Sequence, residues 1–263
     1  MTEYTKTKKK PNVMPVIAVV AIILALELAV SLLLDAYRDR SAEAVALEAA
    51  ALEAAVSSEA TTPPAPIPLG QLLGVSADDW SLRLVRSDML LDSGFVPPLE
   101  EIERGESIDA RAAAALKILI AEARADGYSV YVCSGYRSYE TQLIIYDKHI
   151  EEYQQQGMTL EEAHAATLLA VNYPGGSEHQ LGLAVDLLEY EKQDMQPYIG
   201  GSGLMLWLEE HCAEYGFIVR YPEGKTDITG VEYEPWHLRY VGDCAAYIME
   251  NDLCLEEFLA LLD

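Results

Sequence analysis

Two residues that can bind a metal, His179 and Asp186, lie seven positions apart in the segment SEHQLGLAVD. If this segment is a turn followed by a strand, its leucines point to one face and Gly182, Ala184 and Asp186 point to the other. The carboxylate then stands on a face without bulky side chains, just downstream of the imidazole. Imidazole and carboxylate are both zinc ligands in proteins. The segment therefore predicts two ligands, and the rest of the chain must supply a third.

A third ligand candidate, His237, closes the segment EPWH at residues 234–237. Residues three apart on a regular strand face opposite ways, but Pro235 disfavours a regular central strand and predicts a kink or an edge. Such a kink would turn Glu234 and His237 toward one cavity. A carboxylate beside an activated water is the general base that a hydrolytic zinc enzyme needs. Three protein ligands leave a fourth position open, which is typical of catalytic rather than structural zinc.

A positive charge comes from Arg137, in the segment SGYRS between a predicted strand and a predicted helix. At the end of a strand its guanidinium can reach a cleft, where it would hold a developing oxyanion or a substrate carboxylate. The structural alternative for a single arginine in a turn is a surface salt bridge.

The chain is strongly acidic, with a formal net charge of −25 over 263 residues and an isoelectric point of about 4.4. Nucleic-acid binding depends on lysine and arginine neutralising phosphates, so a nucleic-acid partner is excluded. The acidity is typical of a solubilising surface. The four cysteines form no CxxC pair, which argues against a cysteine zinc site. A disulfide stays open, with Cys244 and Cys254 the closest pair in sequence.

The N-terminus predicts a single membrane anchor. Residues 1–12 are polar and carry four lysines, and residues 13–34 are almost entirely apolar. As a helix, the apolar segment would reach about 33 Å, enough to cross a bilayer. Glu27 within it costs about 2.5–3.5 kcal/mol, which the surrounding aliphatic residues offset. The preceding lysines place residues 1–12 in the cytoplasm and the rest outside; a cleaved signal peptide is the alternative.

Residues 35–69 predict a helical Ala/Glu-rich stalk that ends in a Pro-rich linker. The folded domain is expected over residues 70–263. Helices are predicted over 110–126, with Asp109 as N-cap and Gly127 as stop, and over 138–155, 159–170, 204–215 and 255–262. Strands are predicted over 128–133, 181–188, 217–221 and 231–241. This irregular alternation favours an α+β fold, in which helices flank a small mixed or antiparallel sheet.

Three separated segments resemble one known family. SGYRSYETQ, PGGSEHQLGLAVDL and GFIVRYPEGKTDITGVEYEPWHLRYVG occur in the order found in VanY-type D-alanyl-D-alanine carboxypeptidases. These belong to a group of zinc metallopeptidases related to lysostaphin and hedgehog domains. The resemblance covers about residues 80–263. It implies zinc held by His179, Asp186 and His237, with Glu234 as catalytic base and Arg137 stabilising the tetrahedral intermediate.

The same resemblance implies that Ser177 and Gln142 line the substrate pocket. It also draws attention to the pair Gly175-Gly176, because relatives often carry an aromatic residue after the first glycine. We expect this pair to loosen the loop that precedes Ser177.

The function implied is a zinc-dependent D,D-carboxypeptidase that hydrolyses the terminal D-Ala-D-Ala bond of peptidoglycan stem peptides. The expected location is the cell membrane, with a single-pass anchor and an extracellular catalytic domain. One alternative is an L,D-carboxypeptidase acting on tetrapeptide stems, which shares these motifs. A second is a wall-binding module that keeps zinc without catalysis. Glu234 and Arg137 argue against it, because a silent module would be free to lose either residue.

Overall fold

The computed structural model describes residue 32, residues 67–190 and residues 195–262. Within this part, Ile67 begins a compact unit that runs to the C-terminus. The predicted cytoplasmic tail, membrane anchor and most of the stalk and linker lie outside the described residues, apart from Leu32, which is helical. Among the helices that are described, none is long and apolar enough to cross a membrane.

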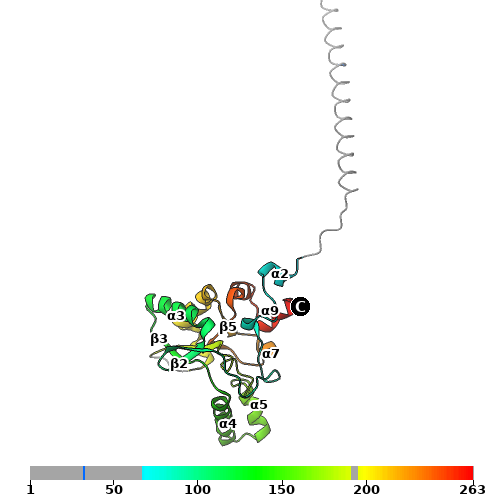
Figure 1. Cartoon of the computed structure of the whole chain (residues 1–263). Coiled ribbons are helices and arrows are strands. Elements are labelled where there is room, and N and C mark those ends of the chain that lie inside the picture. Colours follow the sequence, from blue (N-terminus) through cyan, green and yellow to red (C-terminus); the bar gives the residue numbers. More distant parts are fainter. Residues whose placement is uncertain (1–31, 33–66, 191–194, 263) are drawn as a thin grey trace, which may run out of the picture. The chain divides into compact units, whose positions relative to one another are not determined.

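A four-stranded antiparallel sheet lies at the centre of the unit (Figure 1). Its order is β3-β4-β6-β5, so β4 and β6 are the central pair. The strands are β3 (Val130–Ser134), β4 (Ala184–Glu189), β5 (Phe217–Tyr221) and β6 (Glu234–Tyr240). The α+β prediction is confirmed, and its sheet is antiparallel. A separate hairpin joins β1 (Leu99–Glu103) to β2 (Glu106–Asp109).

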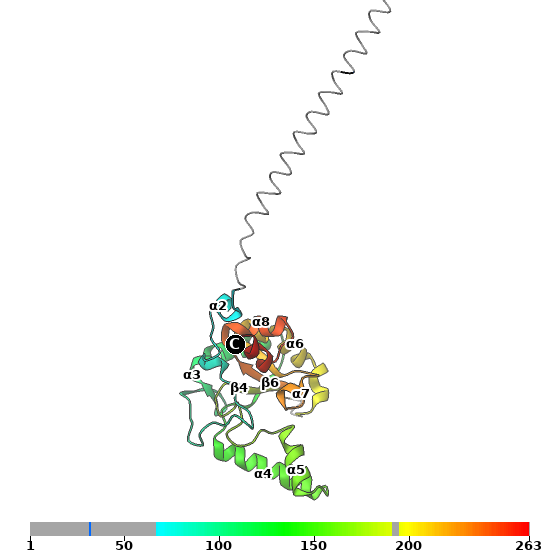
Figure 2. The same cartoon turned by 90° about the vertical axis from the view of Figure 1, so that its right-hand side faces the viewer.

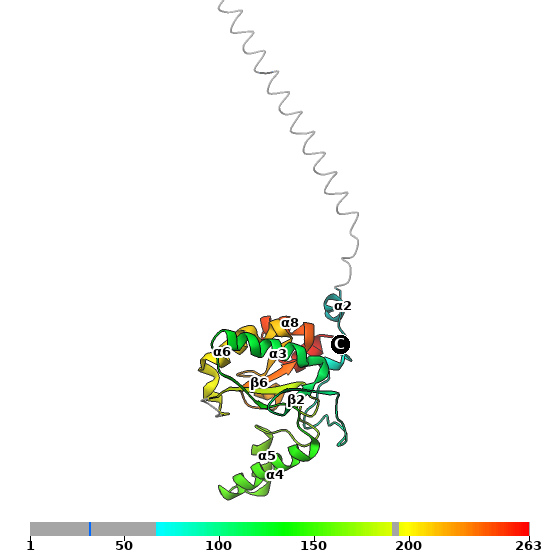
Figure 3. The same ribbon diagram turned by 60° about the vertical axis from the view of Figure 1, so that its left-hand side comes forward.

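Helices cover the sheet unequally. In Figure 3, α3 (Ala110–Ala125), α6 (Gly203–His211) and α8 (Ala245–Glu250) lie on one side of the sheet. The pair α4 (Tyr139–Gln155) and α5 (Leu160–Leu168) projects from the other side (Figures 2 and 3). The remaining elements are α2 (Leu69–Leu73), α7 (Thr226–Thr229), α9 (Leu255–Leu262) and the 3-10 turns η1 (Trp80–Leu82), η2 (Pro197–Gly201), η3 (Cys212–Tyr215) and η4 (Gly242–Cys244).

The main core fills the space between the sheet and α3 and α6. Leu116 and Leu119 of α3 meet Leu187 of β4 and Leu238 of β6, and all four are fully buried. A second cluster packs Ala245 and Ile248 of α8 and Leu255 and Phe258 of α9 with Ile218 of β5. Burying such side chains is the main stabilising contribution to the fold. On the other face of the sheet lies a cavity whose wall includes Asp186 of β4, His237 of β6 and Gln142 of α4.

Local signals account for most element boundaries. Asp109 caps α3, its side chain accepting a hydrogen bond from the Arg111 N–H, and Gly127 follows the helix at φ +97°. Strand β5 and helix α9 lie where they are predicted. The strand expected over 181–188 begins instead at Ala184, because the preceding residues form tight turns. All four cysteines are free, so the disulfide left open by the sequence is not formed.

Candidate metal centre and active site

The register of the two central strands brings two metal-ligand candidates together. Asp186 of β4 lies opposite His237 of β6, and His237 Nδ1 lies 3.0 Å from Asp186 Oδ1. From the loop before β4, His179 places its Nε2 3.3 Å from Asp186 Oδ2. One ligand atom from each of the three side chains lies within 4.8 Å of the others. The three residues predicted as ligands therefore converge on one point.

Two turns aim His179 at this point. The Gln180 N–H donates to Ser177 O, and the Gly182 N–H donates to His179 O. Gly182 has φ +72°, and a Cβ there would lie 2.9 Å from the backbone N of Asp109, so only glycine fits without strain. His179 Nδ1 lies 2.7 Å from Gly135 O. A carbonyl only accepts, so Nδ1 carries the proton and Nε2 presents a lone pair toward Asp186.

The residues fit zinc. Two imidazoles and a carboxylate are common zinc ligands, and three protein ligands leave an open position. All three side chains are buried, and Asp186 Oδ1 makes no hydrogen bond within the described residues, although His237 Nδ1 lies 3.0 Å away. A buried, ionised oxygen that makes no hydrogen bond is costly. A bound cation would satisfy it.

The electrostatics favour a cation in the same place. Burial lowers the pKa of His179. Burial raises the pKa of Asp186, but the imidazoles of His179 and His237 outweigh it and hold this pKa well below its usual range. Burial lowers the pKa of His237, but Asp186 and Glu178 outweigh it and raise this pKa to about 9. A cation at this point must therefore displace a proton from His237.

Glu234 reaches the same cleft through an irregular stretch of β6. There β6 advances four residues, from Leu238 to Glu234, while the paired strand β5 advances two. The extra length turns Glu234 back toward the side of His237, with Glu234 Oε2 3.7 Å from His237 Nδ1. The kink predicted from Pro235 is confirmed. Strand β6 is central but not regular: its pairing with β5 shifts at Pro235, as expected, and Pro235 lies beyond the stretch that pairs with β4.

The environment of Glu234 suits proton transfer. Burial raises the pKa of its carboxyl, and nearby Asp186 adds to the effect, to a value of about 8. A carboxyl with a pKa near the working pH can both take up and release a proton. The positive charge of a bound metal would move this pKa downward.

Arg137 is held on another wall of the cleft. Its Nη1 donates to Gln142 Oε1 at 2.9 Å, and its Nη2 donates to Ser134 Oγ at 3.0 Å. Its nearest carboxylate oxygen is Asp186 Oδ2, at 3.9 Å from Nη2. Two neutral partners therefore orient the guanidinium without neutralising its charge. The alternative of a surface salt bridge is wrong, since the side chain is mostly buried and lines the cleft.

The two predicted pocket residues have different surroundings. Ser177 lines the cleft beside the metal-ligand candidates. Gln142 also borders the cleft, but it is 1% exposed, and its Nε2 donates to Asn172 O at 2.6 Å while its Oε1 accepts from Arg137. Its contacts therefore position Arg137.

The loop before Ser177 is tightly packed. A Cβ added to Gly176 would lie 2.9 Å from the backbone carbonyl of Arg86 and from the N of Ser87. The expectation of a loosened loop is wrong, because the absence of side chains lets this loop press against residues 86 and 87.

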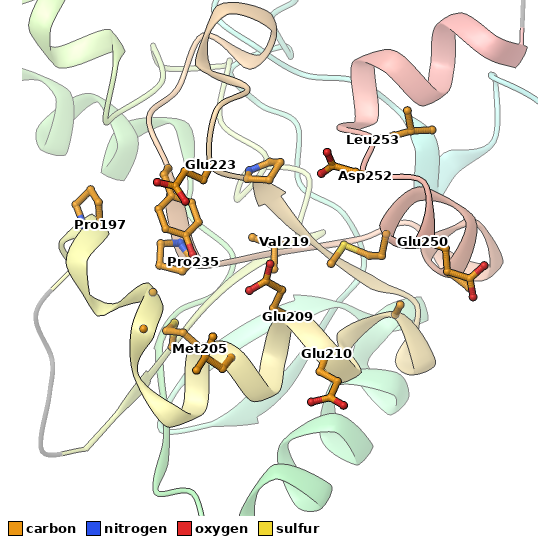
Figure 4. Close-up of a pocket in the computed structure, with 18 of the residues that line it drawn as sticks. Pro197, Met205, Glu209, Glu210, Val219, Glu223, Pro235, Glu250, Asp252 and Leu253 are labelled. Carbon is orange, nitrogen blue, oxygen red and sulfur yellow. The ribbon is translucent and has the colours of Figure 1, made fainter.

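All seven predicted site residues line one cavity of about 640 Å³. That volume lies within the range of small-molecule sites. A second hollow, of about 1000 Å³, lies between α6, α8 and β5 (Figure 4), and none of the predicted site residues lines it. This second hollow is lined by carboxylate side chains, those of Glu209, Glu210, Glu214, Glu223, Glu250 and Asp252. The residues able to do chemistry are thus gathered in the smaller cavity.

Sequence reasoning missed two residues beside His237. The ring of Tyr221 packs on the His237 imidazole, with centroids 4.9 Å apart. Glu178 is buried, and its Oε2 lies 3.9 Å from His237 Nε2. Glu178 directly precedes His179 in the motif, and this position indicates that it lies near the metal-ligand candidates. Its partners Arg220 and Arg239 are distant in sequence, so the motif alone does not reveal the contact.

Comparisons with known proteins agree with this geometry. A family model, VanY: D-alanyl-D-alanine carboxypeptidase, matches residues 105–243. A D-alanyl-D-alanine carboxypeptidase of Enterococcus faecalis is 43% identical over 182 residues, which cover 69% of this chain and 66% of that relative. This chain therefore spans just under two thirds of the length of that relative.

Solved structures give the same match. A mutant of the D,D-pentapeptidase VanY from a VanB-type resistance cassette, in complex with Zn(II), is 44% identical with a TM-score of 0.63, covering 69% of this chain and 99% of that one. VanYB in complex with D-alanine-D-alanine is 43% identical with a TM-score of 0.64, and the match covers 69% of this chain and 98% of VanYB. The LdcB LD-carboxypeptidase is 36% identical with a TM-score of 0.59, and the match covers 68% of this chain and 86% of LdcB. The chain belongs to the VanY family.

Proposed function

We propose that this chain is a zinc-dependent D,D-carboxypeptidase that removes the terminal D-alanine from peptidoglycan stem peptides ending in D-Ala-D-Ala. The observation that carries the proposal is the convergence of His179, Asp186 and His237 in one cleft, with Glu234 beside them and Arg137 across from them. The similarity to VanY proteins solved with Zn(II) and with D-Ala-D-Ala supports both the metal and the substrate.

His179 Nε2, His237 Nδ1 and a carboxylate oxygen of Asp186 would hold the zinc. When bound, zinc supplies Lewis-acid chemistry: it polarises a carbonyl group and makes water more acidic. The protein contributes the remaining chemistry. Glu234 takes the proton from the water that attacks the carbonyl carbon between the two D-alanines. Arg137 donates to the oxygen on which negative charge develops.

Collapse of the tetrahedral intermediate breaks the C–N bond, and the proton held by Glu234 passes to the leaving amine of D-alanine. The same carboxyl therefore acts first as base and then as acid. The products are free D-alanine and a stem shortened by one residue, and all atoms of the water are accounted for.

The catalytically silent alternative is not favoured, because Glu234 and Arg137 both stand in the cleft in usable positions. The D,D reading is favoured over the L,D reading by identity, 43–44% against 36% for the LD-carboxypeptidase neighbour. The two enzyme classes differ in the residue that precedes the scissile bond. A D,D-carboxypeptidase cleaves after a D residue, whereas an L,D-carboxypeptidase cleaves after an L residue.

We further propose that residues 13–34 anchor the chain in the cell membrane as a single span, with residues 35–69 as stalk and linker. The support is the apolar sequence of that segment and the lysines before it. The domain over residues 70–263 would then face the wall outside the membrane, where stem peptides occur. Residues 1–12 would face the cytoplasm.

Substrate choice can be tested with the purified full chain and two defined muropeptides. One carries a pentapeptide stem ending in D-Ala-D-Ala, and the other a tetrapeptide stem ending in a single D-alanine. We expect D-alanine release from the pentapeptide and a rate at least about tenfold lower from the tetrapeptide. The variant His179→Ala is the control for contaminating activity. Faster release from the tetrapeptide would overturn the D,D assignment.

A further inference from the structure

Glu178 is a buried carboxylate that the proposed chemistry does not use. Its side chain is fully enclosed, and its two oxygens have different surroundings. Oε1 accepts from Arg220 Nε at 2.8 Å and from Arg239 Nη1 at 2.7 Å. Oε2 has no hydrogen-bond partner among the residues that the structure describes. The carboxylate is therefore ionised and held firmly at one oxygen, while the other is unused.

The unused oxygen faces another unused atom. Glu178 Oε2 lies 3.9 Å from His237 Nε2, and His237 Nε2 is also buried and lacks a partner within the described part of the chain. This separation exceeds a hydrogen-bond length, but no other described group competes for either atom. The other nitrogen of the ring, Nδ1, faces Asp186 at 3.0 Å. The imidazole of His237 thus lies between two carboxylates.

The arginines fix Glu178 to the rest of the domain. Arg239 Nη2 donates to the backbone oxygens of Ser81 and Arg83 at 2.8 and 2.9 Å. Arg220 donates through both terminal nitrogens to Glu256 of α9, at 2.9 and 2.7 Å. A carboxylate clamped in this way cannot turn away from His237 without breaking buried ion pairs, which is costly.

An ion-pair role alone does not account for this arrangement. Two buried arginines would be satisfied better if each bound its own carboxylate oxygen, yet both share Oε1. The second oxygen is left for His237. Metal-binding histidines commonly donate their other N–H to a carboxylate, which sets the tautomer and the ring orientation.

We propose that Glu178 is a positioning residue for the metal centre: its Oε2 accepts the Nε2–H of His237, so that Nδ1 presents its lone pair to the metal. In His179 the roles of the two ring nitrogens are reversed: Nδ1 donates to Gly135 O, which leaves Nε2 for the metal. The ring of Tyr221 packs on His237 and limits its tilt. The inference rests on zinc at the proposed site.

The test measures the zinc affinity of the full chain by competition with a chromophoric chelator. It compares wild type with the variants Glu178→Gln and Glu256→Gln. Glu178→Gln removes the charge at nearly constant shape. Glu256→Gln is the matched control, because it weakens the same arginine network without touching His237. We expect Glu178→Gln to weaken zinc binding about 10- to 100-fold, the usual effect of losing such a partner. Glu256→Gln should stay within about twofold of wild type while its melting temperature falls.

Cobalt substitution gives a second readout that loss of stability does not move. The visible d–d bands of Co²⁺ should shift in Glu178→Gln and match wild type in Glu256→Gln. If both variants weaken zinc equally, or if Glu178→Gln binds zinc like wild type, the positioning role is wrong. A wild-type chain that binds no zinc would overturn the metal site itself, so the two failures are distinguishable.

A measurement on wild type covers the case in which Glu178→Gln does not fold. In the zinc-loaded full chain, ¹⁵N NMR of the imidazoles should show a proton on His237 Nε2 and none on Nδ1. A proton on Nδ1 would overturn the proposal.

Discussion

Arg137 illustrates how a charge can be kept available in a buried site. Its guanidinium is oriented by the neutral oxygens of Gln142 and Ser134, and its contact with Asp186 is 3.9 Å. A guanidinium offers several donors in one plane, which an ammonium group cannot reproduce. Arg137 is therefore oriented by neutral partners to bind a developing oxyanion, with Asp186 as a more distant carboxylate.

We expect Arg137→Lys to lower kcat for D-alanine release by about 10²–10³, the usual cost of losing an oxyanion donor. Zinc content should stay unchanged, because Arg137 is not a metal-ligand candidate. Steady-state kinetics with metal analysis measure both. Arg104→Lys is the control, since Arg104 lies over Tyr131 outside the cleft. A variant with full kcat would show that Arg137 does not serve the reaction.

Zinc affinity should depend on pH through His237. Its pKa is raised to about 9 by Asp186 and Glu178 against the effect of burial, so the free site holds a proton at neutral pH. Zinc must displace that proton from Nδ1, and one proton released means about tenfold tighter binding per pH unit. The affinity should rise between about pH 7 and 9 and level off above. Chelator competition across this range measures it, and a flat profile would contradict the assignment.

At the scale of elements, the site depends on strand register. Pairing of Asp186 with His237 on adjacent central strands places two ligand candidates together, and the irregular stretch of β6 adds Glu234. A one-residue slip would turn each side chain to the other face. Long-range pairing of this kind cannot be read from a single sequence, although Pro235 predicts the kink.

The tight packing of Gly176 against residues 86 and 87 gives a prediction for the loop before Ser177. Gly176→Ala should lower the free energy of unfolding by about 1–3 kcal/mol, because backbone must shift to admit the Cβ. Gly201→Ala is the control, since a Cβ there meets nothing within 4 Å. Gly201→Ala should change the free energy of unfolding by less than about 0.5 kcal/mol. Thermal unfolding compares them, and equal stabilities would show that the loop yields freely.

What the sequence predicts and what it misses have different physical origins. Helix α3 follows from its periodic apolar residues and its Asp109 cap, which are local signals. The β1–β2 hairpin escapes prediction because its strands, LEEIE and ESID, are mostly polar. Glu178 also escapes, because its arginine partners lie 42 and 61 residues away. Local chemistry is predictable from the chain, whereas contacts set by the tertiary fold are not.

For the molecule as a whole, the proposed anchor makes a prediction about location. The full chain, expressed in a bacterial host, should stay with the membrane fraction after an alkaline carbonate wash. A chain beginning at residue 35 should be recovered without membrane, because the apolar segment over 13–34 is gone. Protease added outside intact spheroplasts should degrade the domain of the full chain. Release of the full chain by the wash would contradict the anchor.

The central claim is that a metal held by His179, Asp186 and His237 works together with Glu234 to release D-alanine. The most direct test is mass spectrometry of a pentapeptide stem incubated with the full chain or with Glu234→Gln, each with its zinc content determined. We predict about one zinc per chain in both proteins. Wild type should release one D-alanine per stem, and Glu234→Gln should release at least about 10³-fold less. D-alanine release by zinc-loaded Glu234→Gln at the wild-type rate, or by wild type freed of metal, would contradict the account.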